Sequence, residues 1–141
     1  MTTNSAAVRV GRLLEIRAAA GYRTASDVDA LFDAVETELT KLPRHKLIVT
    51  VVDWRRCPIM ETKAAERLLQ RVMLLNPRTE RSAALATEQA PSAVLQFMRL
   101  IRESRLPDRK MFLKTAELIP WMNEVLDPPE RERLRQFLSD G

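Results

Sequence analysis

The sequence predicts a single α/β domain, with a mostly parallel or mixed sheet of roughly four to five strands flanked by about five helices. Residues 46–53 (Lys-Leu-Ile-Val-Thr-Val-Val-Asp) form a β-branched run that is typical of a strand buried on both faces. Strand-like and helix-like segments alternate along the chain, which favours a mainly parallel sheet. A length of 141 residues with 45% hydrophobic residues suits one folded domain.

The first residues of the chain, 1–7, are small and polar, so we expect them to be loose and the domain to span residues 8–141. Apolar and polar residues alternate over residues 8–18, which predicts a half-buried strand. If Gly11 marks a turn or bulge, the same segment forms two paired strands. The sequence leaves both forms open.

A first helix is expected to begin after Thr24, which suits an N-cap, with Asp27 three residues later as an approximate capping box. Pro43 ends this helix before the buried strand at residues 46–53. Its apolar residues recur at helical spacing: Val28, Leu31, Phe32, Val35, Leu39 and Leu42.

A second helix is predicted after Pro58, and the pair Asn76-Pro77 ends it. One stripe of this helix is apolar: Met60, Ala64, Leu68, Val72 and Leu75. Residues 82–87 are small and bounded by polar residues, which predicts a short strand.

The C-terminal half continues the alternation. Pro91 suits the first position of a third helix, and residues 111–113 form a further short strand. Thr115 is the expected cap of a fourth helix, which Pro120 should kink or delay. Residues 127–130 (Asp-Pro-Pro-Glu) are a strong start for a last helix. The expected core residues of the third helix are Val94, Phe97, Met98 and Ile101.

Composition excludes several kinds of site. Cys57 is the only cysteine, so neither an internal disulfide nor a multi-cysteine metal centre is expected. Three glycines, at positions 11, 21 and 141, cannot build a glycine-rich phosphate loop. The sequence has no apolar run of about 18 residues and no signal-peptide pattern. We therefore expect a cytoplasmic protein without a transmembrane segment, a metal or a cofactor.

The charge pattern is that of a mixed, solvated surface. The net charge of +4 allows anionic partners, but 19 acidic residues are interspersed with 23 basic ones. Aromatic residues make up only 5% of the chain, and Phe32, Phe97 and Phe137 lie on predicted core stripes. Few rings are left to stack on bases, so we do not expect nucleic-acid binding.

Several short segments carry a family resemblance: Val49-Thr50-Val51-Val52-Asp53, Asn76-Pro77-Arg78 with Arg81-Ser82-Ala83, Leu95-Gln96-Phe97-Met98-Arg99 with Arg102-Glu103, Asp108-Arg109-Lys110-Met111-Phe112, and Trp121-Met122. With the order of elements, they resemble STAS domains, and more closely the bacterial SpoIIAA-like (STAS/SEC14-type) domains. The resemblance covers roughly residues 8–138. It implies a single-domain STAS-like fold and a regulatory role in protein interaction.

Regulatory members of the STAS group carry a phosphorylated serine in an Asp-Ser-Ser-Gly sequence at the start of the helix after the buried strand. Here the matching stretch is Met60-Glu61-Thr62-Lys63-Ala64, and the loop before it is longer. Thr62 has the only hydroxyl there, at a helix N-terminus that would favour a phosphate. The resemblance thus makes Thr62 the phospho-acceptor candidate. A surface threonine in a first helical turn is the alternative.

The turn after the buried strand is the expected partner-binding surface. In open α/β sheets, sites form outside the carboxyl ends of the strands, where Asp53, Arg55, Arg56 and Glu61 fall. We expect Asp53 to tie down the loop and both arginines to face a partner protein, with little effect on stability. The sequence also leaves open whether the chain forms a homo-oligomer.

Arginines later in the chain form a candidate anion-binding set: Arg78, Arg81, Arg99, Arg102 and Arg109. Spacings of three to four residues could bring some of them to one face, where guanidinium groups could grip a carboxylate or phosphate. Internal pairing, for example of Arg99 with Glu103, is the alternative.

Catalytic groups are scarce, and we expect no catalytic residue. His45 stands at the amino end of the buried strand, away from the expected site, and Cys57 has no plausible base near it in the sequence. The expected function is a non-enzymatic, STAS-like interaction or regulatory module in a bacterial cytoplasm. The alternative, from the SEC14 side of the resemblance, is a carrier or sensor of a small anionic or lipid-like ligand.

Overall fold

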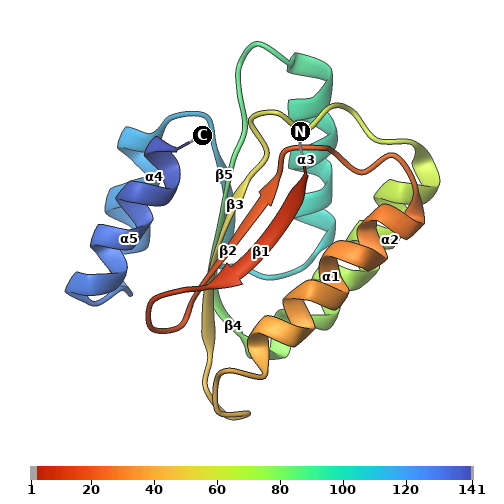
Figure 1. The fold of residues 1–141 in the computed structure, drawn as a ribbon. Helices are drawn as coiled ribbons and strands as arrows, with labels where there is room; N and C mark the ends of the chain where they lie inside the picture. Colours follow the sequence, from red (N-terminus) through yellow and green to blue (C-terminus); the bar gives the residue numbers. More distant parts are fainter. Residues whose placement is uncertain (1–2, 141) are drawn as a thin grey trace.

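A five-stranded mixed sheet forms the centre of the computed structural model, which describes residues 3–140 (Figure 1). The strands lie side by side in sequence order: β1 (Asn4–Val8), β2 (Leu13–Ala18), β3 (Ile48–Asp53), β4 (Thr79–Leu85) and β5 (Arg109–Phe112). β1 is antiparallel to β2, and all other neighbours are parallel. The predicted α/β class and mixed sheet are confirmed.

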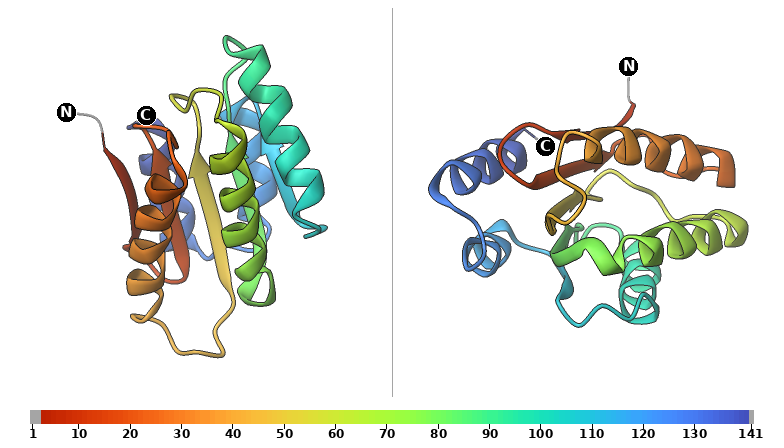
Figure 2. Two further views of the ribbon diagram at one scale, coloured as in Figure 1. Left: turned by 90° about the vertical axis from the view of Figure 1, so that its right-hand side faces the viewer. Right: turned by 90° about the horizontal axis from the view of Figure 1, so that it is seen from below.

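Three helices cover one face of the sheet: α1 (Ala25–Leu39), α2 (Thr62–Leu74) and α3 (Pro91–Glu103) (Figures 1 and 2). Each connects two neighbouring parallel strands, and the strand order always advances in the same direction. Right-handed crossovers therefore place all three on one side. The short 3₁₀ helix η1 (Asn76–Arg78) leads from α2 into β4.

The last two helices, α4 (Thr115–Asn123) and α5 (Pro128–Ser139), cover the opposite face (Figure 2). Without them that face would expose the apolar side chains that β2, β3 and β4 project toward it. The sheet thus separates two cores, which is why β3 is apolar on both faces. The buried residues of this second core are Leu13, Val49, Val51, Ala83, Leu85, Leu118, Met122, Leu126, Leu134, Phe137 and Leu138.

The N-terminal segment forms two strands joined at Gly11, one of the two forms that the sequence left open. Gly11 has a φ of +56°, which glycine adopts readily. The expectation of a loose start is corrected for residues 4–7, which pair with β2. Backbone pairing needs no apolar side chains, so a small polar segment can form an edge strand. Residues 1 and 2 lie outside the described residues.

Pro91 is the first residue of α3, as predicted, and two of the three predicted N-cap residues are confirmed. The Thr24 side chain accepts from Asp27 N at the start of α1, and Asp127 and Glu130 form a reciprocal capping box on α5. The expected cap at Thr115 is wrong: Lys114 is the N-cap, without a side-chain bond, and Thr115 is the first residue of α4.

Two expectations within the helices have different outcomes. Pro120 lies inside α4 without ending it. Met98 was expected in the core of α3 but is exposed, because Ala93, Phe97 and Leu100 form the buried stripe instead. The outward face of α3 is therefore more apolar than the sequence pattern suggested.

The sequential strand order has a consequence for binding sites. A crevice at the carboxyl ends of parallel strands opens where the strand order reverses, because neighbouring connections then leave toward opposite faces. Over residues 3–140 the order does not reverse. The carboxyl edge is instead filled by the loop of residues 54–61, which we call the β3–α2 loop, and by the end of α5 (Figure 1).

Candidate functional site

Asp53, at the end of β3, lies beside Arg17 of β2. The two residues are register partners in the parallel pair, so their side chains project from the same face of the sheet. Arg17 Nη1 donates to Asp53 Oδ2. The carboxylate is buried, with an exposed fraction of 5% for the residue. This ion pair is a direct product of the strand register.

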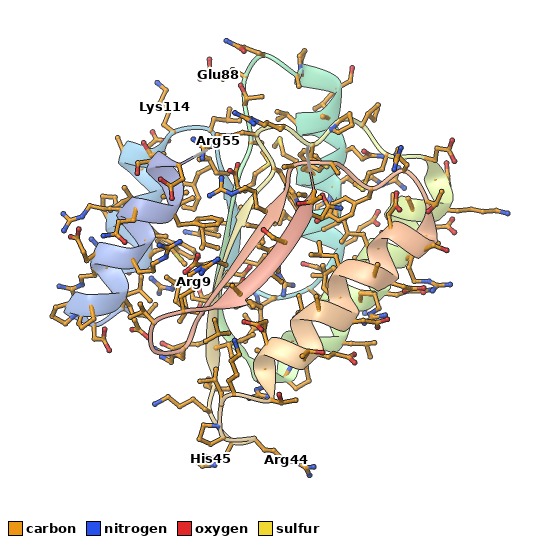
Figure 3. All side chains as sticks on the ribbon, viewed as in Figure 1. Arg9, Arg44, His45, Arg55, Glu88 and Lys114 are labelled. Atoms are coloured by element: carbon orange, nitrogen blue, oxygen red, sulfur yellow. The ribbon has the colours of Figure 1, made fainter. Side chains whose placement is uncertain are left out.

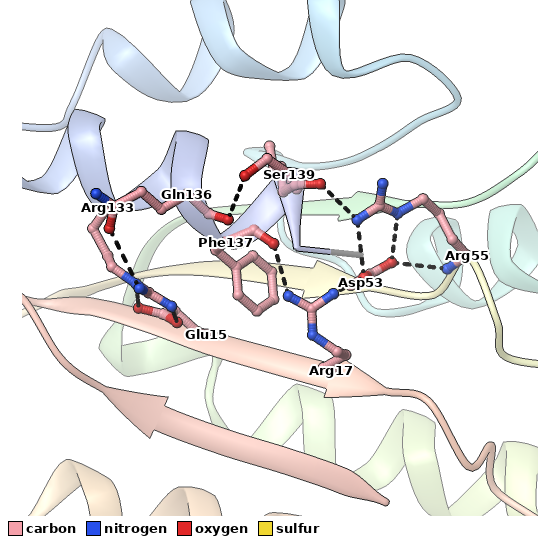
Figure 4. A network of polar contacts seen from close by, with 9 residues as sticks. Glu15, Arg17, Asp53, Arg55, Arg133, Gln136, Phe137 and Ser139 are labelled. Carbon is pink, nitrogen blue, oxygen red and sulfur yellow. Dashed lines mark hydrogen bonds and ion pairs between the residues drawn. The ribbon is translucent and has the colours of Figure 1, made fainter. Parts of the chain in front are cut away.

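Arg55 supplies the remaining partners of Asp53 (Figure 4). Its backbone N–H and its Nε both donate to Asp53 Oδ1 at 3.0 Å, and its Nη2 donates to Oδ2 at 3.1 Å. The side chain of Arg55 thus turns back toward the residue two positions before it. Both carboxylate oxygens are hydrogen-bonded, as a buried charge requires.

The pKa of Asp53 is set by two opposing effects. Burial disfavours the charged form and would raise the pKa of this carboxyl group. The hydrogen bonds from Arg55 and the positive charges of Arg55 and Arg17 outweigh burial, and the pKa lies below its ordinary value of 3.8. Asp53 is therefore ionised at neutral pH.

The same two arginines bind the C-terminal end of α5. Arg17 Nη2 donates to Phe137 O at 2.7 Å, and Arg55 Nη2 donates to Leu138 O at 2.9 Å. The Arg17 guanidinium also lies 4.2 Å from the centre of the Phe137 ring. The last carbonyls of a helix lack intrahelical donors, and positive charge is favourable there. Arg17, Arg55 and Asp53 thus form a clamp, the Asp53 clamp, that joins β2, β3 and α5.

A second ion pair lies along the same helix (Figure 4). Arg133 of α5 donates through Nε and Nη2 to the two carboxylate oxygens of Glu15, both at 2.8 Å. Glu15 is 3% exposed, although it lies on the strand face that alternation marks as polar. α5 covers this face, so Glu15, Arg17 and Asp53 connect the helix to the sheet.

The predicted partner surface is therefore divided. Asp53 and Arg55 are used inside the protein, and the expectation that Arg55 faces a partner is corrected: its guanidinium is the main donor to a buried carboxylate. Arg56 and Glu61 are exposed, and neither makes a side-chain hydrogen bond or ion pair within the described chain. Figure 3 shows Arg55 at the edge where β3 ends.

The β3–α2 loop is held by three buried side chains. Trp54 stacks on Phe97 of α3, with ring centres 4.4 Å apart, and its Nε1 donates to Tyr22 OH at 3.3 Å. Cys57 and Met60 are also buried. These anchors fix the loop against the protein and leave Arg56, Ile59 and Glu61 on the outside.

α3 holds the second half of this loop. Gln96 Oε1 accepts from Met60 N at 2.7 Å, and Gln96 Nε2 donates to Met60 O at 2.9 Å. Ile59, the residue before Met60, has an exposed fraction of 59%. On α3 itself, Leu95 and Met98 are exposed by 69% and 51%.

Gly21 allows the turn before α1 to approach the loop closely. Its φ is +76°, and a Cβ at this position would lie 2.7 Å from Pro58 Cδ. Any larger residue would therefore meet both backbone strain and a steric clash.

Thr62, the candidate phospho-acceptor, is the first residue of α2 and is exposed. It lines a groove of about 220 Å³ between α2 and α3, which Arg99 and Glu103 also line. Arg99 Nε donates to Glu103 Oε1 at 2.8 Å, which is the internal pairing that the sequence left as the alternative. Phosphorylation of Thr62 stays a prediction.

The candidate anion-binding arginines do not converge on one site. Arg78 donates to the carbonyls of Leu39, Pro43 and Lys46. Arg81 lies on the α4 face, where it donates to Trp121 O and pairs with Glu124 at 2.8 Å. Both are structural connections from η1 and β4 to neighbouring elements.

Arg102 and Arg109 differ sharply in environment. Arg102 is exposed and makes no side-chain hydrogen bond within residues 3–140. Arg109 is 7% exposed and lines a cavity between the sheet and α1–α3. Burial lowers the pKa of its guanidinium to about 10, so the group still carries its charge at neutral pH.

The single histidine and the single cysteine of the sequence lie in different surroundings. His45 lies at the amino end of β3, opposite Arg55 (Figure 3). Cys57 is buried, and burial raises the pKa of its thiol to about 12, so it is a neutral thiol at physiological pH.

Sequence reasoning missed Arg17 and Thr50. The alternation over residues 8–18 predicts only a half-buried strand with Arg17 on its polar side, and it gives no sign that α5 covers that side. Thr50 was read as part of an apolar run. A hydroxyl in such a run, opposite Ser82 on the next strand, marks a polar place in a buried sheet face.

Comparisons with family models, with curated proteins and with solved structures find no match to this chain. In the described residues, no helix has both the length and the apolar character that a membrane span requires. Residues 3–140 also contain no group of three or more His, Cys, Asp or Glu side chains arranged to hold a metal ion.

Proposed function

We propose that this chain is a non-enzymatic protein-interaction module of STAS-like type, acting in a bacterial cytoplasm through the β3–α2 loop and the outer face of α3. One observation carries the proposal: the loop is fixed by buried anchors, yet it presents Ile59 to solvent between the uncompensated charges of Arg56 and Glu61. A preordered loop loses little conformational entropy on binding.

The exposed apolar side chains of α3 extend this surface. Gln96 joins the loop to α3, so Ile59 and Leu95 belong to neighbouring segments of one rigid unit. Apolar side chains rimmed by charges are typical of protein interfaces. The non-enzymatic character is supported by the distant position of His45 and by the buried, neutral thiol of Cys57.

The alternative function, a carrier or sensor of a small anionic or lipid-like ligand, draws on a different part of the fold. Its support is the cavity beside Arg109. The two functions involve different residues, so they are tested separately.

Site-specific photo-crosslinking in the source cell tests the interaction proposal. A photoreactive amino acid in place of Ile59 should give a discrete crosslinked species, and the same group in place of Leu47 should give none. Leu47 is 44% exposed but lies just before β3, at the opposite edge of the sheet. Equal crosslinking from both positions, or none from Ile59, would contradict the proposal.

A matched pair of charge substitutions adds a control for specificity. Leu95→Glu should weaken the crosslink formed from position 59, whereas Leu74→Glu should not. Leu95 and Leu74 are 69% and 73% exposed, and Leu74 lies at the end of α2. A crosslinked species with twice the mass of the chain would identify the partner as a second copy.

A further inference from the structure

The β3–α2 loop presents one apolar side chain between two opposite charges. Ile59 is 59% exposed, and the exposed residues Arg56 and Glu61 lie three positions before it and two positions after it. Within residues 3–140 neither charged side chain forms an ion pair, although Asp140 lines a small cavity together with Arg56. Along the chain, the outer surface of the loop is therefore positive, then apolar, then negative.

The backbone of the loop keeps these two charges apart. On α3, the Arg99–Glu103 pair shows that exposed opposite charges close in sequence pair where the backbone brings them together. In the loop, the segment between the charges is anchored, because Cys57 and Met60 are buried. Gln96 also hydrogen-bonds both the N–H and the C=O of Met60. The two charges consequently stay on either side of the exposed apolar side chain, available to a partner.

Such a surface is complementary to its own copy. In a two-fold symmetric dimer the same patch of both copies takes part, so that residue i of one copy faces residue j of the other while j faces i. A two-fold axis beside Ile59 sets Arg56 of each copy opposite Glu61 of the other. A patch with only one sign of charge would instead repel its own copy at this place.

The outer face of α3 adds apolar area next to the loop. Seven large apolar side chains are exposed in residues 3–140, and three of them, Ile59, Leu95 and Met98, belong to the loop and α3. Leu95 directly precedes Gln96, the residue that binds the loop, and Met98 follows three residues later on α3. Burial of these side chains supplies the hydrophobic part of an interface, which exposed ion pairs alone do not provide.

We infer that the partner of this surface is a second copy of the chain, in a two-fold symmetric dimer with two reciprocal Arg56–Glu61 ion pairs around Ile59. This dimer uses the surface of the proposed function and specifies its partner, so it rests on that proposal. The mixed charge of the loop favours a second copy over a strongly acidic or strongly basic partner, which one end of the loop would repel.

Sedimentation velocity over a range of protein concentrations, combined with charge reversals, tests the dimer. Wild type should pass from monomer to dimer as the concentration rises. Arg56→Glu makes both loop charges negative and Glu61→Arg makes both positive. Each variant alone should dimerise more weakly by at least about tenfold, because two ion pairs become two like-charge contacts. Arg44→Glu makes the same charge change as Arg56→Glu at the exposed opposite edge of the sheet (Figure 3) and should dimerise like wild type.

Mixing the two charge-reversal variants gives the sharper result. Arg56→Glu and Glu61→Arg at equal concentrations should restore the dimer, with one copy of each variant, and the double variant Arg56→Glu/Glu61→Arg should dimerise alone. Binding to an unrelated partner predicts neither rescue. A wild type that stays monomeric at millimolar concentration, single variants that dimerise like wild type, or a mixture that stays monomeric would each overturn the second copy as partner.

The crosslinking experiment at position 59 separates failure of the dimer from failure of the proposed function. A monomeric wild type whose crosslinked species contains a different protein would overturn the dimer and leave the interaction surface in place. The absence of any crosslink from position 59 would contradict the interaction surface itself.

Discussion

Arg55 binds the carboxylate of Asp53 through three donors, although only one residue separates them in the chain. The same guanidinium continues to the carbonyl of Leu138 in α5. A motif that looks like an exposed polar turn in the sequence is therefore part of the connection between the sheet and the last helix. Of the predicted partner surface, Arg56 and Glu61 are the residues whose side chains the clamp does not use.

The pH dependence of stability should report the ionisation of Asp53. Its pKa is lowered in the folded state, so its contribution is fully present above the unfolded-state pKa near 3.9 and is lost as the pH falls through the folded-state pKa. Asp53→Asn keeps half the acceptor capacity and should cost on the order of 1–2 kcal/mol at pH 7.

Urea unfolding of wild type and Asp53→Asn at pH 7 and at pH 3 measures this contribution. The difference in unfolding free energy between the two proteins should be smaller at pH 3, because wild-type Asp53 is then closer to protonation. A difference that stays constant between the two pH values would show that the charge of Asp53 does not stabilise the fold.

Cys57 should be unreactive in the folded protein. Burial raises the pKa of its thiol to about 12, so at pH 8 very little thiolate is present, and the side chain is shielded as well. Labelling with a thiol-specific disulfide reagent should be slow in buffer and should accelerate with urea concentration as the protein unfolds. Complete labelling within minutes in the absence of urea would contradict the buried position.

Gly21→Ala should destabilise the protein by roughly 1–3 kcal/mol, because alanine at positive φ is strained and its Cβ would clash with Pro58. Thermal unfolding measures this loss of stability. Ala30→Gly, at an exposed position within α1, is the reference substitution, and it should lower the unfolding free energy by about 1 kcal/mol through helix propensity alone. If Gly21→Ala melts at the wild-type temperature, the close packing of this turn on the β3–α2 loop is wrong.

The fold could be predicted largely from local patterns. β3 is recognisable because both of its faces are buried, and the starts of α1 and α5 because Thr24 and Asp127 are effective caps. The pairing of residues 4–7 was missed because it depends on backbone hydrogen bonds, which do not require any particular type of side chain. The exposure of Met98 was missed because the spacing of apolar residues along α3 fits two neighbouring faces of the helix. The sequence pattern favoured the face with Met98, whereas the structure buries the face with Ala93, Phe97 and Leu100.

The candidate site was less predictable because its partners come from distant parts of the chain. Arg17 and Asp53 meet through strand register, and α5 covers them from 120 residues beyond Arg17 in the sequence. Alternation correctly marked Glu15 and Arg17 as polar, but it cannot distinguish a solvated face from one covered by an arginine-rich helix.

Thermal unfolding of Arg55→Ala and Arg56→Ala, measured side by side, tests the central claim that one of two adjacent arginines holds the fold while the other, which is exposed, does not. Arg55→Ala removes two of the three side-chain donors of a buried carboxylate and should cost roughly 1–3 kcal/mol, lowering the Tm by about 3–10 °C. Arg56→Ala removes an exposed charge and should change the Tm by less than about 2 °C. Equal melting temperatures for the two variants would contradict this division of roles.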